Sequence, residues 1–378
     1  MARLEIDRLA KAFGAATVFD GLDLHVERGE TVAVYGRSGC GKSVLLSILS
    51  GALAADGGDL RIDGKSVIDA PPEARDVGMA FQNFALYPHM SAFDNIASPL
   101  RGQKKPAREI ADKVQAVAAL LKIDHVLAHS PQALSNGQRQ RTSLARALVA
   151  EPAVLLLDDP LRNVDAKLRY EMRLEMPNLF RQFESAVIYV TQDSREAMAL
   201  ADRIAILHDG KFRQIGAPQE VYEFPCTAEV GQLLGDPAIN LFACESAARD
   251  GALLVNPAGC EVNISGRYDL PAAGKYLAGV RPEDIDLAAT PAPAPSADAD
   301  GPARGIEAVV ERITPANVRS LLVASTAAGE TITVSLPELA AEQVAPKSRA
   351  WLSFPADKLL LFAADGGQLI RPNPPAGG

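Results

Sequence analysis

The chain has 378 residues, of which 48% are hydrophobic and 22% are charged, and its formal net charge is −9. This length exceeds that of one compact domain, so we expect two, and the negative charge argues against a nucleic-acid partner, which requires a basic face. No apolar run reaches the roughly 18 residues that a membrane-spanning helix needs, and the first residues contain no apolar signal-peptide core. We therefore expect a cytoplasmic protein, for which any role at a membrane depends on partner subunits.

Residues 1–235 alternate short apolar segments with amphipathic ones. Strands are expected at 31–36, 76–81, 153–159, 186–191 and 203–216, and helices at 107–121, 137–149 and 166–182. Strands that alternate with helices predict a largely parallel sheet covered on both faces. The opening segments RLEIDRLAKAF and DGLDLHV are expected to form antiparallel strands beside this core.

From residue 236 the helical period fades, and short strand candidates separated by turn-forming residues continue to the C-terminus. This pattern predicts a small β-barrel or sandwich. Residues 289–305 (ATPAPAPSADADGPARG) are rich in Pro and Ala and poor in large apolar side chains, so we expect a surface loop there. The four cysteines, at positions 40, 226, 244 and 260, have no spacing typical of a metal site, and a disulfide framework is not expected in a reducing compartment.

Residues 36–43, GRSGCGKS, match the pattern G-x-x-x-x-G-K-[ST] between an apolar strand and a helical run, which is the context that this motif requires. Its glycines allow backbone N–H groups to surround phosphate oxygens. Lys42 can reach the β- and γ-phosphates, and the Ser43 hydroxyl can ligate Mg²⁺. We therefore predict a nucleotide-binding segment that consists of Gly36, Arg37, Ser38, Gly39, Cys40, Gly41, Lys42, Ser43 and Val44.

Two other apolar strands end in polar residues. The segment VLLLDDP leads into Asp158, which we expect to hold Mg²⁺ directly or through water. An aspartate after a strand is common by itself, but its place after Ser43 in an alternating α/β chain makes the prediction specific. The segment AVIYVT is followed by Gln192, which we expect at the same rim of the sheet.

Between these motifs, LSNGQRQRTSLARALVAEPAVLLLDDP resembles the signature region of ATP-binding-cassette (ABC) ATPases. GMAFQNFALYPHMSAFDNIASPL (78–100) resembles the Q-loop of that family and the segment after it. GVRPEDIDL (279–287) and WLSFPADKLLLF (351–362) resemble the C-terminal β-domain of its carbohydrate-importer branch, the maltose and glycerol-phosphate type. The resemblance implies an α/β fold: a P-loop NTPase (RecA-like) core at 1–235 with antiparallel β and helical (84–150) subdomains, then an all-β OB-like (TOBE/MOP-type) domain at 236–378.

The resemblance also implies a head-to-tail ATPase dimer in which each ATP lies between the phosphate-binding segment of one subunit and the signature of the other. Phe13 would stack on adenine; the alternative is a plain core aromatic. Gln82 would contact Mg²⁺ and the attacking water. Asp165 would signal across the dimer interface. Ser135, Gly137 and Gln138 would close on the γ-phosphate of the partner's ATP.

The implied partners are a second ATPase subunit, two transmembrane permease subunits and, indirectly, an extracytoplasmic solute-binding protein. Four residues lie where the family receives the coupling helix of the permease: Tyr87, Pro88, His89 and Met90. A generic exposed loop is the alternative for these four. The protein would then be peripheral on the inner face of the cell membrane, with ATP and Mg²⁺ as its ligands.

Three residues depart from the family pattern. Asp159 stands where a catalytic glutamate is usual, Gln192 stands at the position of the switch histidine, and Asn136 replaces the first glycine of the signature. Asp159 keeps the charge but withdraws the carboxylate by on the order of 1 Å, and Gln192 can donate a hydrogen bond but cannot exchange a proton as imidazole can. We expect Gly137 to approach the phosphate most closely, so the donated signature remains usable.

Three interpretations of these departures are open: neutral drift with normal turnover, a heterodimer with a catalytically complete ATPase, and a homodimer that hydrolyses slowly. The heterodimer is favoured. For function, the leading hypothesis is the ATP-binding subunit of a sugar or polyol importer. The alternatives are a nucleotide-gated regulatory protein without transport, and an importer ATPase for a polyamine or an inorganic anion.

Overall fold

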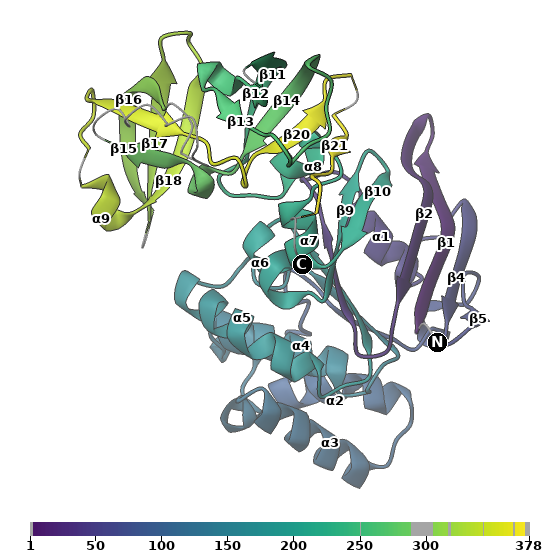
Figure 1. Ribbon diagram of the computed structural model, residues 1–378. Coiled ribbons are helices and arrows are strands. Elements are labelled where there is room, and N and C mark those ends of the chain that lie inside the picture. Colours follow the sequence, from purple (N-terminus) through teal and green to yellow (C-terminus); the bar gives the residue numbers. More distant parts are fainter. Residues whose placement is uncertain are drawn as a thin grey trace. The chain divides into compact units, whose positions relative to one another are not determined.

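The computed structural model describes residues 3–249, 251–288, 305–316, 319–342, 344–365 and 367–374 (Figure 1). The chain divides into two compact units, Met1–Val221 and Tyr222–Gly378. Within the second unit, the Arg281 guanidinium donates hydrogen bonds to backbone carbonyls of Tyr222, Gly231 and Leu234, and the domain boundary expected at residue 235 stays a prediction. Apart from its last residue, the loop predicted at 289–305 lies outside the described residues.

The first unit contains two sheets and a group of helices. Its strands are β1 (Leu4–Phe13), β2 (Ala16–Val26), β3 (Thr31–Tyr35), β4 (Gly57–Ile62), β5 (Lys65–Ser66), β6 (Val77–Ala80), β7 (Val154–Asp158), β8 (Ala186–Thr191), β9 (Arg203–His208) and β10 (Lys211–Gly216). Its helices are α1 (Lys42–Leu49), α2 (Ala92–Gly102), α3 (Ala107–Leu120), α4 (Asn136–Leu148), α5 (Ala166–Phe180) and α6 (Ser194–Leu200), and α7 (Pro218–Glu223) spans the boundary to the second unit.

The central sheet has the strand order β10-β9-β3-β8-β7-β6, and all of its pairs are parallel except that of β9 with β10. The predicted parallel sheet is therefore confirmed. The second sheet, β2-β1-β4-β5, is antiparallel and contains the two opening segments, as predicted.

Both faces of the central sheet are covered, as the alternating side chains of β7 illustrate. Leu155 and Leu157 point into a core that they share with α2, α3, α4 and α5. Val154 and Leu156, which alternate with them, point into a second core with α1 and the antiparallel sheet. Each such side chain contributes about 1.5–3 kcal/mol through burial, so the strand is fixed from both sides. Figure 1 shows α2–α5 as one group and the antiparallel strands as another.

The second unit consists mainly of antiparallel strands. These are β11 (Asn240–Arg249), β12 (Ala252–Val255), β13 (Val262–Asn263), β14 (Ala273–Val280), β15 (Asp286–Ala288), β16 (Ile306–Ala316), β17 (Arg319–Thr326), β18 (Thr331–Pro337), β19 (Arg349–Ser353), β20 (Leu360–Ala363) and β21 (Leu369–Ile370), with the short helices α8 (Ala228–Leu233) and α9 (Glu338–Ala341). They form the sheets β13-β12-β11-β14-β20-β21 and β15-β19-β16-β17-β18. Both sheets share one core, in which the rings of Phe242 and Phe354 stack with centroids 5.6 Å apart.

Four strands of the central sheet end at the same edge. The register pairs Tyr35 with Thr191, Asp158 with Val190 and Ala80 with Leu157. Because these strands are parallel, the loops that follow β3, β6, β7 and β8 leave the sheet side by side, which is where ligands bind in sheets of this kind. Among the described residues, no helix combines the length and apolar content needed to cross a membrane.

Candidate functional site

A cavity of about 320 Å³ lies at this edge of the central sheet. It brings together residues from all four loops, and most of them were predicted. Its lining consists of Ser38, Gly39, Gly41, Lys42, Ser43, Val44, Gln82, Asp158, Asp159, Arg162, Val190 and Gln192. The sequence motif for phosphate binding, the predicted metal ligands and the two departures Asp159 and Gln192 thus share one cavity.

The loop between β3 and α1 needs glycine at two positions. At Gly41, where φ is +105°, an added Cβ would lie 2.7 Å from the Phe19 ring. At Gly36 an added Cβ would overlap the carbonyl oxygen of Leu207. Close packing against β9 and β2 therefore fixes the loop that leads into α1, and it leaves the backbone N–H groups at the start of that helix facing the cavity side.

The Lys42 side chain is buried beneath this loop. Its Nζ donates hydrogen bonds to the carbonyl oxygens of Gly36 (2.6 Å) and Arg37 (2.8 Å), and Cys40 Sγ lies 3.8 Å away. An ammonium group has three N–H donors, and the third donates to Cys40 Sγ, a weak acceptor that a ligand in the cavity would have to displace. Predicted residues Gly36, Arg37 and Cys40 therefore shape and anchor the loop rather than line the cavity.

Asp158 and Asp159 place two carboxylates in the cavity wall. Burial raises the pKa of Asp158, and the positive charge of Lys42 opposes that shift. Burial also raises the pKa of Asp159, which the Arg162 charge counteracts. A raised pKa makes a carboxylate a stronger base, so the environment of Asp159 suits a proton acceptor even though its side chain is short.

The backbone at Asp159 is in the left-handed region, with φ of +44°. Its N–H donates to the carbonyl of Val190 at 2.8 Å, which connects the end of β7 to the end of β8. Arg162 N–H then donates to the Asp159 carbonyl at 3.2 Å, and the two side chains form an ion pair of 3.6 Å. A non-glycine residue with this φ is strained, so the turn is held by these contacts.

Gln192 follows β8 directly and is exposed at the cavity. The turn that presents it is fixed by Thr191, whose Oγ1 accepts from the Asp193 N–H at 3.0 Å and donates to Glu196 at 2.9 Å. Asp193 caps α6 by accepting from the Arg195 and Glu196 backbone N–H groups. The position expected for a switch residue is therefore well defined.

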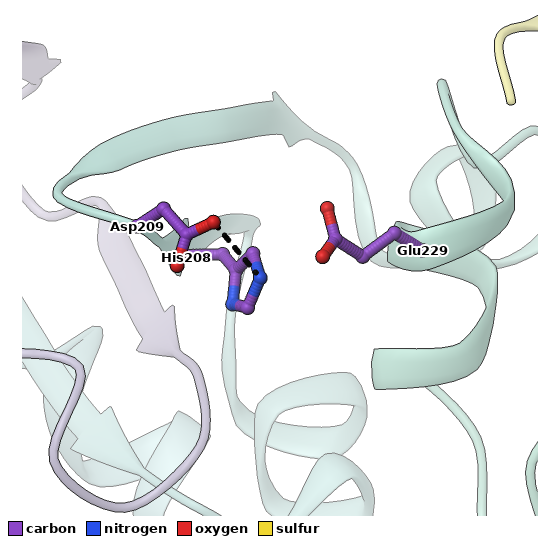
Figure 2. Close-up of side chains that lie close together, drawn as sticks. All are labelled: His208, Asp209 and Glu229. Carbon is purple, nitrogen blue, oxygen red and sulfur yellow. Dashed lines mark ion pairs between the residues drawn. The ribbon is translucent and has the colours of Figure 1, made fainter. Parts of the chain in front are cut away.

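No histidine belongs to the described lining of the cavity. His208, the nearest candidate in sequence, lies at the end of β9 and forms an ion pair of 3.5 Å with the adjacent Asp209 (Figure 2).

The segment after Gln82 is held by an arginine of α4. The Arg146 guanidinium donates to the carbonyls of Ala85 (2.8 Å) and Phe84 (3.3 Å) and lies 5.5 Å from the centroid of the Tyr87 ring. Burial lowers the pKa of Arg146, but an arginine stays charged at neutral pH. Phe84 and Ala85 have φ of +65° and +45°, a left-handed backbone that these hydrogen bonds help to maintain.

The predicted permease-contact residues are anchored by Asn95 in α2. This fully buried side chain accepts from the Tyr87 N–H at 2.7 Å and donates to the carbonyls of Tyr87 (3.1 Å), Met90 (3.2 Å) and Ser91 (2.9 Å). The Tyr87 side chain remains 45% exposed, and Pro88 and His89 are exposed. The segment therefore has a fixed backbone and an accessible surface.

The signature residues form the start of α4. Ser135 accepts from the Gln138 N–H at 3.3 Å, and the Gln138 side chain accepts from the Ser135 N–H at 2.9 Å, which is a reciprocal capping box. Asn136 is exposed, whereas Gly137 is buried with its α-carbon facing the Leu168 side chain of the same chain. Ser135 and Asn136 are exposed, and the expected approach of Gly137 to a partner's phosphate stays a prediction.

Two further predicted residues lie outside the cavity lining. Phe13 is 51% exposed, so it is not a core aromatic, and Lys11 Nζ lies 5.2 Å from its ring centroid. Asp165 caps α5 by accepting from the Leu168 N–H at 3.0 Å. An exposed ring is available for stacking, and an exposed cap is available to a second chain, but their predicted roles remain proposals.

Sequence reasoning did not identify four residues that shape the site: Arg162, Asn163, Arg146 and Asn95. Asn163 donates to the carbonyl of Gln82 at 2.8 Å, which links the loop after β7 to the Q segment. Arg162 and Asn163 could have been predicted from their position, because they closely follow the strand that ends in Asp158. Nothing local indicates the partners of Arg146 and Asn95, because their contacts depend on the packing of α2 and α4.

Comparison with known proteins agrees with this geometry. The ABC transporter family model matches residues 19–162, and the TOBE domain model matches residues 278–362. The chain is 38% identical to the sn-glycerol-3-phosphate import ATP-binding protein UgpC of Escherichia coli O1:K1, over 98% of this chain and 100% of the relative. It is 41% identical to the oligosaccharides import ATP-binding protein MsmX of Bacillus subtilis strain 168, over 75% and 79%.

A third relative is an uncharacterized ABC transporter ATP-binding protein, y4oS of Sinorhizobium fredii strain NBRC 101917 / NGR234, with 40% identity over 78% of this chain and 79% of the relative. The similarity thus spans the P-loop unit and continues into the C-terminal β-unit. The chain belongs to the ABC transporter family, as an ATPase with a P-loop core and a C-terminal TOBE domain.

Proposed function

We propose that this chain is the ATP-binding subunit of an importer for a sugar, a polyol or a glycerol phosphate. The observation that carries this proposal is the full-length similarity to a relative named for sn-glycerol-3-phosphate import, with a second relative named for oligosaccharide import. The cavity supports it, because the phosphate-binding loop and two carboxylates meet there.

ATP is proposed to bind with its phosphates against the loop between β3 and α1. Lys42 contributes its positive charge and the N–H donor that now contacts Cys40 Sγ, and the loop contributes backbone N–H groups. The Asp158 carboxylate, the Ser43 hydroxyl and the Gln82 amide oxygen all line the cavity, and oxygen donors of these kinds are what Mg²⁺ prefers. Bound by these residues, Mg²⁺ would neutralise charge on the β- and γ-phosphates. Phe13 would stack on the adenine.

The proposed mechanical output passes through the segment 84–91. Gln82 lies in the cavity wall, and Arg146 and Asn95 fix the backbone that follows. Tyr87 to Met90 would provide the docking surface for the coupling helix of the permease, which has two transmembrane subunits. The protein would thereby lie on the inner face of the membrane, and a solute-binding protein would act through the permease. A regulatory protein without transport has no use for such a surface. Co-purification with membrane subunits tests this, and purification without them would favour the regulatory alternative.

Hydrolysis at this chain's own cavity is proposed to be slow. Asp159 withdraws its carboxylate by on the order of 1 Å relative to a glutamate, and misplacement of that size can cost roughly a hundredfold in rate. The Asp159 backbone is fixed by its hydrogen bond to Val190, so it cannot move forward freely. Gln192 can position a phosphate but cannot take up a proton.

The test compares ATPase turnover of the purified chain with that of the double variant Asp159→Glu, Gln192→His. We expect the double variant to hydrolyse ATP roughly tenfold faster or more, because it regains both reach and a proton-accepting imidazole. Adding Lys42→Ala to either protein must abolish turnover, which shows that the measured activity arises in this cavity. Equal turnover of the two parent proteins would contradict a degenerate site.

The dimer is proposed to place Ser135 and Asn136 of one subunit over the ATP of the other. A heterodimer with a complete ATPase stays a prediction that rests on Asp159 and Gln192 alone, since the comparisons give it no support. The mass of the intact transporter decides it: one copy of this chain beside another ATPase agrees with the heterodimer, and two copies refute it. The cargo, including a polyamine or an inorganic anion, is identified by which solute stimulates ATPase activity of the intact transporter.

A further inference from the structure

Arg162 is a positively charged residue in the cavity wall for which no role was predicted. It lies in the loop between β7 and α5 and lines the same cavity as Lys42 and Asp158. Among the described lining residues, Lys42 and Arg162 are positively charged and Asp158 and Asp159 are negatively charged. A nucleoside triphosphate carries several negative charges, so its binding would give the cavity a net negative charge and increase the need for positively charged side chains.

The loop that carries Arg162 is held from two sides. The Arg162 N–H donates to the Asp159 carbonyl at 3.2 Å. The Arg169 side chain, from α5, donates to the carbonyls of Leu161 (3.2 Å), Val164 (3.2 Å) and Arg162 (3.4 Å). The backbone at Arg162 is therefore fixed, and its side chain, which has no other hydrogen bond among the described contacts, is the part that can change partner.

The partner of that side chain is Asp159. Arg162 Nη1 lies 3.6 Å from Asp159 Oδ2, a single contact at the long end of an ion pair, and the arginine side chain is 54% exposed. The Asp159 side chain is only 11% exposed, but water reaches the arginine end of the pair and weakens a single long contact of this kind. A phosphate group offers two oxygens to the planar fork of a guanidinium, which is a stronger arrangement. A phosphate within reach would therefore displace the carboxylate.

We propose that Arg162 is a phosphate-binding residue of the nucleotide cavity and that Asp159 competes with the nucleotide for its guanidinium. This inference rests on the proposed binding of ATP in the cavity. It gives Asp159 a second effect, because a nucleotide that takes Arg162 leaves the Asp159 carboxylate without its ion pair. Arg162 is thus a nucleotide-binding residue, and no proton or group transfer is assigned to it.

The test must separate phosphate contact from simple neutralisation of Asp159, since removing Arg162 weakens nucleotide binding in both cases. The decisive background is Asp159→Asn, in which no charge at residue 159 needs neutralising. Affinity for a non-hydrolysable ATP analogue with Mg²⁺ is measured by calorimetry for Asp159→Asn alone and combined with Arg162→Gln, with Arg162→Lys, or with Arg181→Gln. Arg181 is exposed beyond the end of α5 and outside the cavity lining, so it is the matched control for charge.

If Arg162 contacts phosphate, Arg162→Gln weakens analogue binding on the order of tenfold in the Asp159→Asn background, which is the scale of one charge-assisted hydrogen bond. Arg162→Lys, which keeps the charge and loses the fork, gives a smaller loss, and Arg181→Gln gives none. Unchanged affinity for Arg162→Gln in that background overturns the inference while leaving ATP binding intact. Absence of analogue binding by the folded wild-type chain overturns both this inference and the proposed function.

Discussion

At the scale of single residues, the site is defined by short contacts between neighbours in space. Asp159 illustrates this point: its left-handed backbone, its hydrogen bond to Val190 and its ion pair with Arg162 together fix where the carboxylate lies. The same residue type on a flexible loop would have had no defined distance to a phosphate. The consequences of the substitution at this position can therefore be predicted from its geometry.

Glu196 gives a prediction on pH. It is 2% exposed, and its Oε2 accepts from the Tyr189 hydroxyl at 2.8 Å and from Thr191 at 2.9 Å. Burial raises its pKa above the ordinary value of 4.5 despite these two hydrogen bonds. The pKa of Glu196 is higher in the folded state than in the unfolded state. The contribution of Glu196 to the free energy of unfolding is therefore fully present below pH 4.5 and is lost as the pH rises through the pKa of the folded state.

Glu196→Gln keeps an acceptor for both hydroxyls without the buried charge. We expect the variant to have a higher free energy of unfolding than the wild type at pH 7, with the difference shrinking as the pH falls toward 4.5. Urea unfolding at several pH values measures it. A difference that is independent of pH would show that Glu196 does not titrate in this range.

The contiguous phosphate-binding residues were predictable because their chemistry and spacing occupy one segment, Gly36 to Val44. Asp158 and Gln192 were predictable because parallel strands end at one edge. Arg162 was not, since its role depends on a strained turn that no local pattern announces. The closeness of Gly137 to Leu168 was not predictable either, because it depends on the packing of α4 on the start of α5, and the expected approach of Gly137 to a phosphate stays a prediction.

At the scale of elements, helix α4 connects two distant parts of the site. Its first turn contains the signature residues, and Arg146 near its end holds Phe84 and Ala85. Helix α2 holds the other end of the same segment through Asn95. Most helices and strands of the first unit were predicted within a few residues, because their apolar periodicity is strong. The strand expected at 203–216 is instead the antiparallel pair β9 and β10, and neither α2 nor these side-chain connections were predicted.

Asn95→Ala tests this connection. The change removes four hydrogen bonds to the backbone of residues 87–91 and leaves buried groups without partners, which costs about 2 kcal/mol. We expect lower stability to urea and faster amide hydrogen exchange confined to residues 84–91.

Ser98→Ala is the control for this variant, because Ser98 lies on the same helix and makes a single hydrogen bond, to the Asn95 carbonyl. Exchange that accelerates equally throughout α2 in both variants would show that Asn95 acts on the helix rather than on the segment.

At the scale of the whole molecule, each unit has a core of its own. Two cores cover the faces of the central sheet, and a third lies between the sheets of the second unit. Every residue that lines the nucleotide cavity belongs to the first unit, as does Phe13. The β-unit was predictable as a class from its short strands, whereas the contacts of Arg281 with Tyr222, Gly231 and Leu234 were not, because they join residues far apart in the sequence.

A fragment of residues 1–221 is therefore expected to fold and to bind the ATP analogue with an affinity within about threefold of that of the full chain. Calorimetry on the fragment measures this, and the same fragment with Lys42→Ala shows the background. A folded fragment that does not bind would mean that the second unit contributes to the nucleotide site.

The hydrogen bonds of Lys42 affect how loss of activity in Lys42 variants is to be interpreted. Its N–H donors bond to the carbonyls of Gly36 and Arg37 and to Cys40 Sγ, so the side chain holds its own loop together in addition to its proposed contact with phosphate. Truncating it removes these hydrogen bonds and the positive charge at the same time, and arginine does not reproduce them because its donors lie in a rigid planar fork. Loss of activity in a Lys42 variant can therefore result from the altered loop, from the missing phosphate contact or from both. Variants at Ser43 distinguish nucleotide binding from loop structure more clearly.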